Sequence, residues 1–194
     1  MVNPRLPAPL LIAAYSSGYF PMPHPETGEI MWLRPDPRAI LRLDKFHVSR
    51  SLAQSLKKGN FEITFDQAFL KVMRACADRP EGSWIIDAFY VGYEELHKQG
   101  HAHCVEVWRN SRLIGGVYGV SLGGAFFAES KFHRVTDASK IALYHLIRRL
   151  REKQFSLLEV QFLTPHLRSL GAEEISDAQY QLRLSEALKI EVSF

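Results

Sequence analysis

The sequence has few cysteines and no long apolar segment, and both absences narrow the class of protein. Its 194 residues include two cysteines, Cys76 and Cys104, and neither lies in a CxxC pair. This number predicts no disulfide framework and is typical of reduced thiols in a cytoplasmic protein. No apolar run approaches the roughly 20 residues that a membrane-spanning helix needs. Prolines at positions 4, 7 and 9 also break the stretch before 10–14, which argues against a signal peptide, so we expect a cytoplasmic protein.

The composition is that of an ordinary globular chain. Hydrophobic residues make up 46% and charged residues 23%, which excludes a disordered tail, a collagen-like repeat and a coiled coil. The length predicts one domain, or one with a small appendage. The net charge of +3 is compatible with a nucleic-acid partner but too small to indicate one.

Apolar periodicity and capping residues predict a layered α+β fold around one mixed sheet. We expect helices over 9–17, 49–58, 66–77, 87–100 and 137–153, and short helices from Thr164 and Ser176. Strands are expected over 39–43, 61–65, 101–109, 112–120, 124–128 and 157–163. Five prolines between positions 21 and 37 predict an irregular segment that wraps a surface. This element order matches the N-acetyltransferase (GNAT) architecture.

One predicted strand carries two polar residues on a single face. Glu159 and Gln161 lie two positions apart and so point the same way, in an otherwise apolar stretch. Buried polar groups cost free energy unless they are hydrogen-bonded. The two residues therefore form either a satisfied structural pair or a polar pair that lines a cleft.

The segment between the third strand of the meander and the next helix is a second candidate for chemistry. It contains Glu129 and Ser130, and a helix N-terminus follows near Asp137. An enzyme that binds coenzyme A would place a glycine-rich turn there for the pyrophosphate. Residues 132–138 contain no glycine, and Asp137 would repel phosphate, so the segment argues against coenzyme A.

Two further groups each allow two interpretations. The aromatic residues Tyr15, Tyr19, Phe20, Trp32 and Trp84 are either core residues or platforms for an adenine base. Arg50, Lys57 and Lys58 share a predicted helix that is either a solvated face or a contact for nucleic-acid phosphates. His101 and His103 share a strand face, but without a third ligand they predict no metal site.

Several short blocks, taken together and in order, resemble the leucyl/phenylalanyl-tRNA–protein transferase family. The blocks are GYFPM at 18–22, Trp32 followed by RPDPR at 34–38, FHVSRS at 46–51, SWI at 83–85, the run at 93–108, GGVYG at 115–119, FAES at 127–130, ASK at 138–140 and the segment 161–172. Each block alone is weak, but their order over about residues 10–185 is specific.

The resemblance implies a small N-terminal domain at 1–38 and a GNAT-like catalytic domain at 39–194. It implies transfer of leucine or phenylalanine, with methionine as a further candidate, from aminoacyl-tRNA to the N-terminal amine of acceptor proteins. Acceptors beginning with Arg or Lys are expected, and the product is a degradation signal of the N-degron pathway. No cofactor and no metal are expected, and we expect a monomer.

The resemblance also assigns roles to individual residues. It places a catalytic carboxylate–amide pair at Glu159 and Gln161, and substrate orientation at Glu129 with Ser130 beside it. The donor side-chain pocket falls on Val117, Phe126, Leu143 and Leu146. Trp32 and Trp84 fall around the terminal adenosine, and Arg50, Lys57 and Lys58 face the tRNA.

Three positions depart from the family pattern. Glu159 stands where aspartate is usual, Lys131 replaces an apolar methionine, and Arg34 replaces a small residue. A cation near the acceptor site would disfavour N-terminal Arg or Lys and favour Asp or Glu. Alternatively, Lys131 points to solvent or to a tRNA phosphate. An N-acetyltransferase on the same fold and a non-catalytic tRNA-binding protein are the remaining alternatives.

Overall fold

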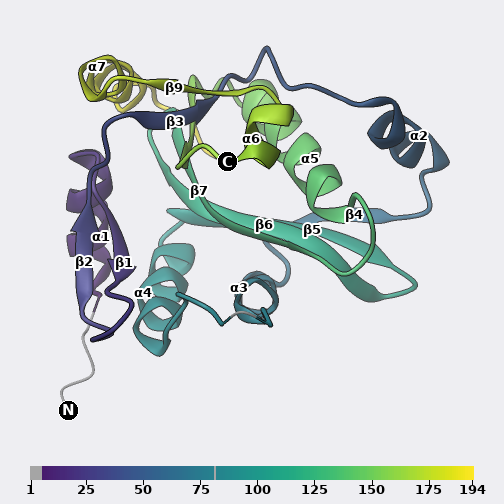
Figure 1. Ribbon diagram of the computed structural model, residues 1–194, viewed down its shortest axis with the longest axis horizontal. Helices are drawn as coiled ribbons and strands as arrows, with labels where there is room; N and C mark the ends of the chain where they lie inside the picture. Colours follow the sequence, from purple (N-terminus) through teal and green to yellow (C-terminus); the bar gives the residue numbers. More distant parts are fainter. Residues whose placement is uncertain (1–5, 81) are drawn as a thin grey trace.

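The fold is built around one large mixed sheet with helices on both faces (Figure 1). The computed structural model describes residues 6–80 and 82–194. The strands of the large sheet are β3 (Arg38–Leu41), β4 (Glu62–Phe65), β5 (Ala102–Arg109), β6 (Arg112–Leu122), β7 (Ala125–His133), β8 (Leu157–Gln161) and β9 (Ala172–Ile175). The helices are α1 (Ala8–Ser16), α2 (Arg50–Lys58), α3 (Phe69–Ala77), α4 (Asp87–Lys98), α5 (Ala138–Glu152), α6 (Pro165–Ser169) and α7 (Asp177–Ala187).

The order of the strands creates a gap in the sheet. The order is β4-β5-β6-β7-β8-β3-β9, and β5, β6 and β7 form the expected antiparallel meander. β7 and β8 run parallel, but they pair only over Ala125–Phe127 and Leu157–Glu159. Beyond these residues the two strands no longer pair, and the second half of β7 borders a cleft. The mixed α+β sheet predicted from the sequence is confirmed.

Helices cover the two faces of the sheet and divide the core in two. α5 lies on one face, and α3 and α4 lie on the other (Figure 1). Leu143, Leu146 and Leu150 of α5 pack in one buried cluster, whereas Phe89 and Tyr93 of α4 pack in the other. The apolar residues of α5 recur every three or four positions, so one side of this helix faces the sheet.

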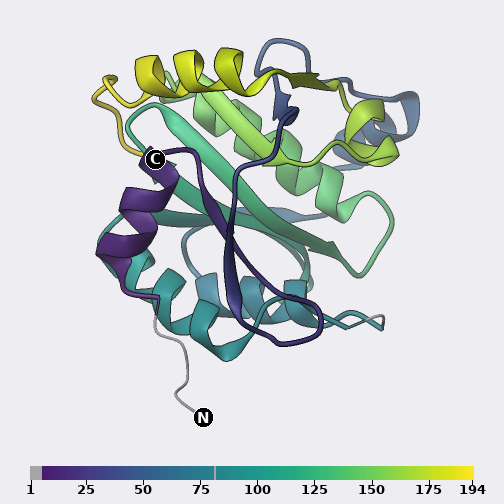
Figure 2. The ribbon, with the colours of Figure 1, turned by 60° about the vertical axis from the view of Figure 1, so that its left-hand side comes forward.

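The N-terminal segment is more regular than predicted. Residues 21–37 were expected to be irregular, but they contain most of a hairpin made of β1 (Phe20–Pro23) and β2 (Ile30–Leu33). Proline lacks the N–H that a ladder requires, yet each strand of this two-stranded sheet has a free edge where that loss is tolerated. The hairpin crosses in front of the large sheet in Figure 2. Leu11, Tyr15 and Phe20 are fully buried and join the core on the α4 side.

Other boundaries also differ from the prediction. The short strand β9 was missed, and it pairs with β3. α3 begins at Phe69 rather than at Asp66, whose carboxylate instead accepts the backbone N–H of Cys104 and contacts His103. Asp137 precedes α5 as predicted, but its side chain does not cap the helix.

Two kinds of feature are absent from residues 6–80 and 82–194. None of the helices in this part of the chain is long and apolar enough to cross a bilayer. Within the same residues, no group of three or more His, Cys, Asp or Glu side chains is placed to hold a metal ion.

Candidate active site between two diverging strands

A cleft of about 850 Å³ opens where β7 and β8 separate. Its walls come from the second half of β7, the end of β8, the start of α5 and the loop after α3. Of the residues predicted to form the site, those that line it are Trp84, Val117, Glu129, Ser130, Leu143 and Gln161. The cleft thus brings together six of the predicted residues, from elements far apart in the sequence.

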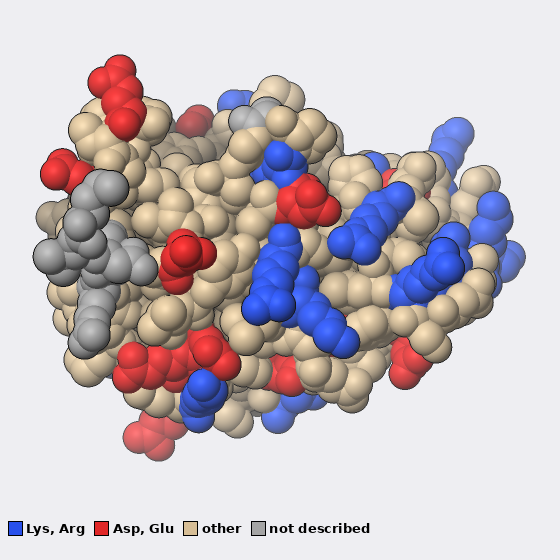
Figure 3. Space-filling view, turned by 90° about the horizontal axis from the view of Figure 1, so that it is seen from below, with Lys and Arg blue, Asp and Glu red and all other residues tan. Residues whose placement is uncertain are grey.

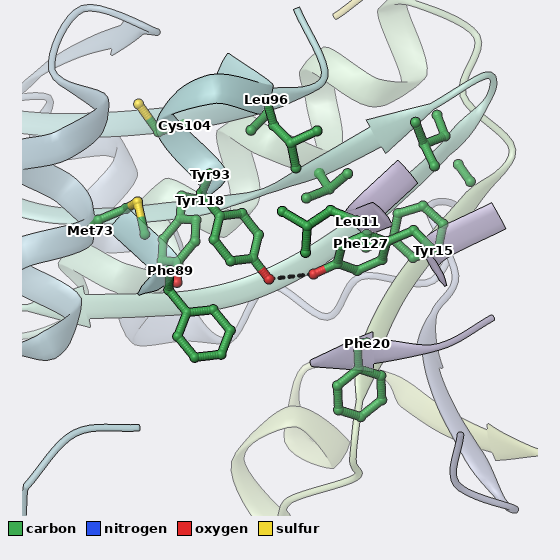
Figure 4. Close-up of a cluster of buried hydrophobic side chains, with 14 of the residues drawn as sticks. Leu11, Tyr15, Phe20, Met73, Phe89, Tyr93, Leu96, Cys104, Tyr118 and Phe127 are labelled. Atoms are coloured by element: carbon green, nitrogen blue, oxygen red, sulfur yellow. Dashed lines mark hydrogen bonds between the residues drawn. The ribbon is translucent and has the colours of Figure 1, made fainter. Parts of the chain in front are cut away.

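A hydrogen-bond network holds Glu129 at the floor of the cleft. Its Oε1 accepts the hydroxyl of Tyr15 at 2.7 Å and the side-chain amide N–H of Gln161 at 2.9 Å. Its Oε2 accepts the hydroxyl of Tyr93 at 3.1 Å. The two tyrosine hydroxyls are 2.5 Å apart, and Figure 4 shows them meeting end to end. Helices α1 and α4 therefore each supply a tyrosine hydroxyl that donates to the same carboxyl group of β7.

The environment of Glu129 changes its acidity. Burial raises its pKa, and the neighbouring Glu159 adds to that, while the three hydrogen bonds oppose the shift; the resulting pKa is about 8. Burial, and next the negative charge of Glu129, raises the pKa of both Tyr15 and Tyr93, so the tyrosines stay protonated as donors. Because the pKa of Glu129 lies near neutrality, this carboxyl group can hold or release a proton under physiological conditions.

Gln161 is held by hydrogen bonds of both its backbone and its side chain. It has a positive φ of 64° at the end of β8, where the strand turns away from the sheet. Its backbone N–H donates to Oε1 of Glu159 at 2.7 Å, and its side-chain amide donates to Glu129. These bonds fix the amide at the cleft floor in a conformation that a non-glycine residue rarely adopts.

Glu159 does not line the cleft, which corrects the expectation of a polar pair there. Its side chain is 0% exposed and forms an ion pair with Arg38 at 3.1 Å. Burial raises the pKa of Glu159, and the charge of Arg38 opposes that shift. Oε1 of Glu159 accepts from Arg38 and from the backbone of Gln161, whereas its Oε2 is buried without a hydrogen-bond partner among the described residues. Glu159 reaches the cleft only through the backbone of Gln161.

Sequence reasoning missed Arg38 as a functional residue. Its guanidinium also donates to the carbonyl of Gly18 and stacks over the ring of Tyr180 at 4.4 Å. Tyr15 was assigned only to a group of aromatic residues, and Tyr93 lay only within the helix expected over 87–100. The one local signal for Arg38 was its position directly before the apolar run 39–41, which suggests that its side chain is buried. A buried cation needs a buried carboxylate, so this position would have predicted an acidic partner.

The predicted donor pocket is only partly open. Val117 and Leu143 line the cleft. Phe126 and Leu146 are 1% and 0% exposed and lie in the core behind it, so they do not border the cleft as expected. The predicted aromatic pair is also divided: Trp84 lines the cleft, whereas Trp32 lies on β2, partly buried against the core.

The predicted basic helix lies beside the cleft. Arg50, Lys57 and Lys58 of α2 are exposed. Ser55, on the same helix, donates to the carboxylate of Asp137, which itself lines the cleft. This bond joins α2 to the start of α5, so the basic helix flanks the opening.

The two unusual cations have different surroundings. Arg34 pairs with Asp177 and does not line the cleft, so it is not the free cation that the sequence predicted near the acceptor. Lys131 lines the cleft beside Ser130. Burial lowers the pKa of Lys131, and the nearby Arg79 lowers it further.

The start of α5 is poorly suited to a pyrophosphate. The carboxylate of Asp137 is buried there and accepts hydrogen bonds from Lys140 and Ser55. Although burial alone would raise its pKa, these two partners lower it, so the group carries a negative charge. A fixed anion before the helix repels phosphate, as the sequence suggested.

Comparisons with known proteins agree with the resemblance. The family model described as "Leucyl/phenylalanyl-tRNA protein transferase" matches residues 40–185, and the model of its N-terminal domain matches 5–36. A leucyl/phenylalanyl-tRNA–protein transferase of Ruegeria sp. (strain TM1040) is 50% identical, covering 94% of this chain and 87% of the relative. Another, of Herpetosiphon aurantiacus, is 48% identical and covers 98% of both chains.

Likeness to solved structures is lower. An aminoglycoside acetyltransferase from an uncultured soil metagenomic sample aligns with a TM-score of 0.44 and 13% identity, covering 68% of this chain and 89% of the other. The family models and the relatives near 50% identity span almost the whole described chain. The chain therefore belongs to the leucyl/phenylalanyl-tRNA–protein transferase family.

Proposed function

We propose that the chain transfers leucine or phenylalanine from aminoacyl-tRNA to the N-terminal amine of a protein, with Glu129 and Gln161 at the reacting atoms. The observation that carries this proposal is the Glu129–Gln161 hydrogen bond of 2.9 Å at the floor of the cleft. A carboxyl and an amide held there can contact both the attacking amine and the ester carbonyl. Positioning two substrates in this way is a large part of the catalytic task.

The reaction replaces an ester by an amide. The nitrogen of the acceptor forms a bond to the carbonyl carbon, the carbon–oxygen bond to the terminal ribose breaks, and the ribose oxygen takes a proton. An N-terminal amine has a pKa of about 7.7–8.0, and the pKa of Glu129 is about 8. Since the two values nearly match, a proton can pass between the amine and Glu129 at little cost.

The amide of Gln161 has a different role. A glutamine is not a base, but its carbonyl oxygen can accept a hydrogen bond from the incoming amine. Glu159 is a positioning residue in this scheme, because it contacts the backbone of Gln161 and not the cleft. The longer side chain of glutamate in place of aspartate suits this role, since its Oε1 reaches both Arg38 and Gln161.

The finer assignments remain predictions. They include acceptors beginning with Arg or Lys, methionine as a donor, a monomeric state, and a domain boundary after residue 38. Acidic acceptors are the alternative to Arg and Lys. Val117 and Leu143 support an apolar donor side chain, because both border the cleft near Glu129.

A single-turnover assay tests the proposal. Radiolabelled Leu-tRNA and Phe-tRNA are mixed with peptides that begin with Arg, Lys, Asp, Glu or Gly, and the labelled peptide is counted. We expect transfer to the Arg and Lys peptides. The proposal would be refuted if neither donor transferred its amino acid to any of the peptides. Tight binding of acetyl-coenzyme A by calorimetry would favour an acetyltransferase instead.

A further inference from the structure

Two cations lie together on the wall of the cleft, next to the proposed reacting groups. Lys131 is two residues after Glu129 on β7, and it is the register partner of Val117 on β6. Arg79 follows α3, where its Nε donates to the carbonyl of Cys76 at 2.9 Å and its Nη2 donates to the hydroxyl of Ser130 at 2.8 Å. Both cations line the cleft.

Neither cation has a carboxylate partner among residues 6–80 and 82–194. No Asp or Glu oxygen of that part of the chain lies within 4.0 Å of Lys131 or Arg79. By contrast, Lys140 at the same cleft is paired with Asp137 at 3.0 Å. Burial lowers the pKa of His166, which also lines the cleft, and the charges of Lys131, Lys140 and His133 lower it further. Lys131 is half-buried and Arg79 is exposed at the rim of the cleft, and cations without a carboxylate partner are suited to an anionic ligand.

The spacing along β7 identifies the anion. A register shift leaves Glu129 between Ala128 and Ser130 without a partner on β6, and Lys131 follows two residues later, at most about 7 Å along the strand. In the aminoacyl end of a tRNA, the ester is separated from the phosphate of the same nucleotide by a single ribose. With an ester held at Glu129, that phosphate comes within reach of Lys131 and Arg79, which line the same cleft.

Further cations lie on the helix beside the cleft. α2 carries Lys57 and Lys58 in its last turn, and its Ser55 donates to Asp137 of the cleft wall. In the view from below, Lys and Arg side chains gather at the centre and right, whereas most Asp and Glu side chains lie at the left (Figure 3). A surface with many cations suits a polyanion better than the short side chain of an acidic acceptor.

We infer that Arg79 and Lys131 form a binding site for the phosphate of the terminal nucleotide of aminoacyl-tRNA. The inference rests on the proposed function, and it gives Lys131 a task that the apolar residue usual at this position could not perform. Lys131 contributes a point charge. Arg79 contributes a guanidinium that is already oriented by Ser130 and Cys76.

Two small ligands that differ only by the phosphate test the site. One is adenosine carrying leucine through a stable 3′-amide, and the other is the same compound with a 5′-phosphate. With the wild-type protein, calorimetry is expected to show about tenfold tighter binding of the phosphorylated ligand. In the variants Lys131→Met and Arg79→Gln this gain is expected to fall to threefold or less, with binding of the unphosphorylated ligand unchanged.

Matched controls remove the same charges elsewhere. Lys71→Met and Arg74→Gln alter exposed residues of α3 that do not line the cleft, and both are expected to retain the full phosphate gain. A phosphate gain that persists in both cleft variants would overturn the inference. A second result would also overturn it. If Lys131→Met changed the preference in the transfer assay from acidic to basic acceptor peptides and still bound the phosphorylated ligand more tightly, Lys131 would contact the acceptor and not the phosphate.

The outcome for the proposed function is separate. A wild-type protein that shows the phosphate gain but transfers no amino acid would support the nucleotide site and refute the transfer activity. Active transfer without any phosphate gain would refute only the site.

Discussion

Glu129 combines burial with three hydrogen-bond donors, and its protonation therefore affects both stability and chemistry. The folded protein binds its proton up to a pKa of about 8, whereas the ordinary value is 4.5. Between these values the folded state holds more protons than the unfolded state, so the free energy of unfolding falls as the pH rises. The stabilisation is complete below about pH 4.5 and is lost as the pH passes about 8.

The variant Glu129→Gln removes this dependence. We expect the fall in unfolding free energy between pH 5.5 and 8 to become shallower, by up to about 1.4 kcal/mol per pH unit. Urea denaturation at several pH values measures it, and Glu94→Gln on the exposed side of α4 is the control. An unchanged slope in Glu129→Gln would mean that Glu129 has an ordinary pKa.

Gln161 is predicted to matter for the reaction and little for the fold. Its side chain borders the cleft and bonds only to Glu129 among the described residues. Gln161→Ala is expected to reduce single-turnover transfer about 100-fold, since a positioned hydrogen-bonding group near the reacting atoms is lost. The melting temperature is expected to change by only a few degrees. Transfer at the wild-type rate would exclude Gln161 from the reaction.

At the scale of elements, α2 presents two lysines in its last turn without a carboxylate partner in the described chain. If Lys57 and Lys58 contact tRNA phosphates, replacing both by alanine weakens binding. The slope of log affinity against log salt is then expected to decrease by about 1 to 2 units. Filter binding at several salt concentrations measures the slope. Lys71→Ala with Lys98→Ala is the matched control, and an equal slope in both double variants would show that α2 is only a solvated face.

Elements with a clear local pattern were predictable, and those set by distant contacts were not. α5 and the β5–β6–β7 meander follow from periods of 3.6 and 2 in the apolar residues. β1 was missed because Pro21 and Pro23 suggest a turn, although its partner strand leaves one edge free. β9 is four residues long and contains two glutamates, so only its pairing with β3 makes it a strand.

The candidate site divides in the same way. Glu129 and Gln161 were identified from blocks of residues that resemble a family. The network around them could not be deduced, because the Tyr15–Glu129 bond spans 114 residues and the Arg38–Glu159 pair spans 121. No local pattern reports on contacts at such separations. The same limit applies to Phe126 and Leu146, whose apolar character does not say whether they face a cleft or the core.

At the scale of the whole molecule, Arg38 joins the N-terminal segment before β3 to the large sheet. It lies at the start of β3 and contacts Gly18 of that segment, Glu159 of β8 and Tyr180 of α7. Removing one partner of a buried ion pair leaves the other charge unpaired, so Arg38→Met is expected to destabilise the protein by about 3–5 kcal/mol. Denaturant unfolding measures the change.

Two further variants test the explanation. Arg38→Met combined with Glu159→Leu removes both charges and is expected to regain a large part of the lost stability. Arg34→Met breaks an exposed pair with Asp177 and is expected to have little effect. If Arg38→Met were as stable as the wild type, Arg38 would not hold the N-terminal segment to the sheet.

The position of β3 also determines when the enzyme can become active during its synthesis. β3 is made early, yet it lies between β8 and β9, which are made more than a hundred residues later. While β8 is still inside the ribosome, β3 has no neighbour, and Tyr15 and Gln161 cannot meet at Glu129. A nascent chain therefore carries the basic helix α2 long before it carries a complete site, and it can transfer an amino acid only after β8 has emerged.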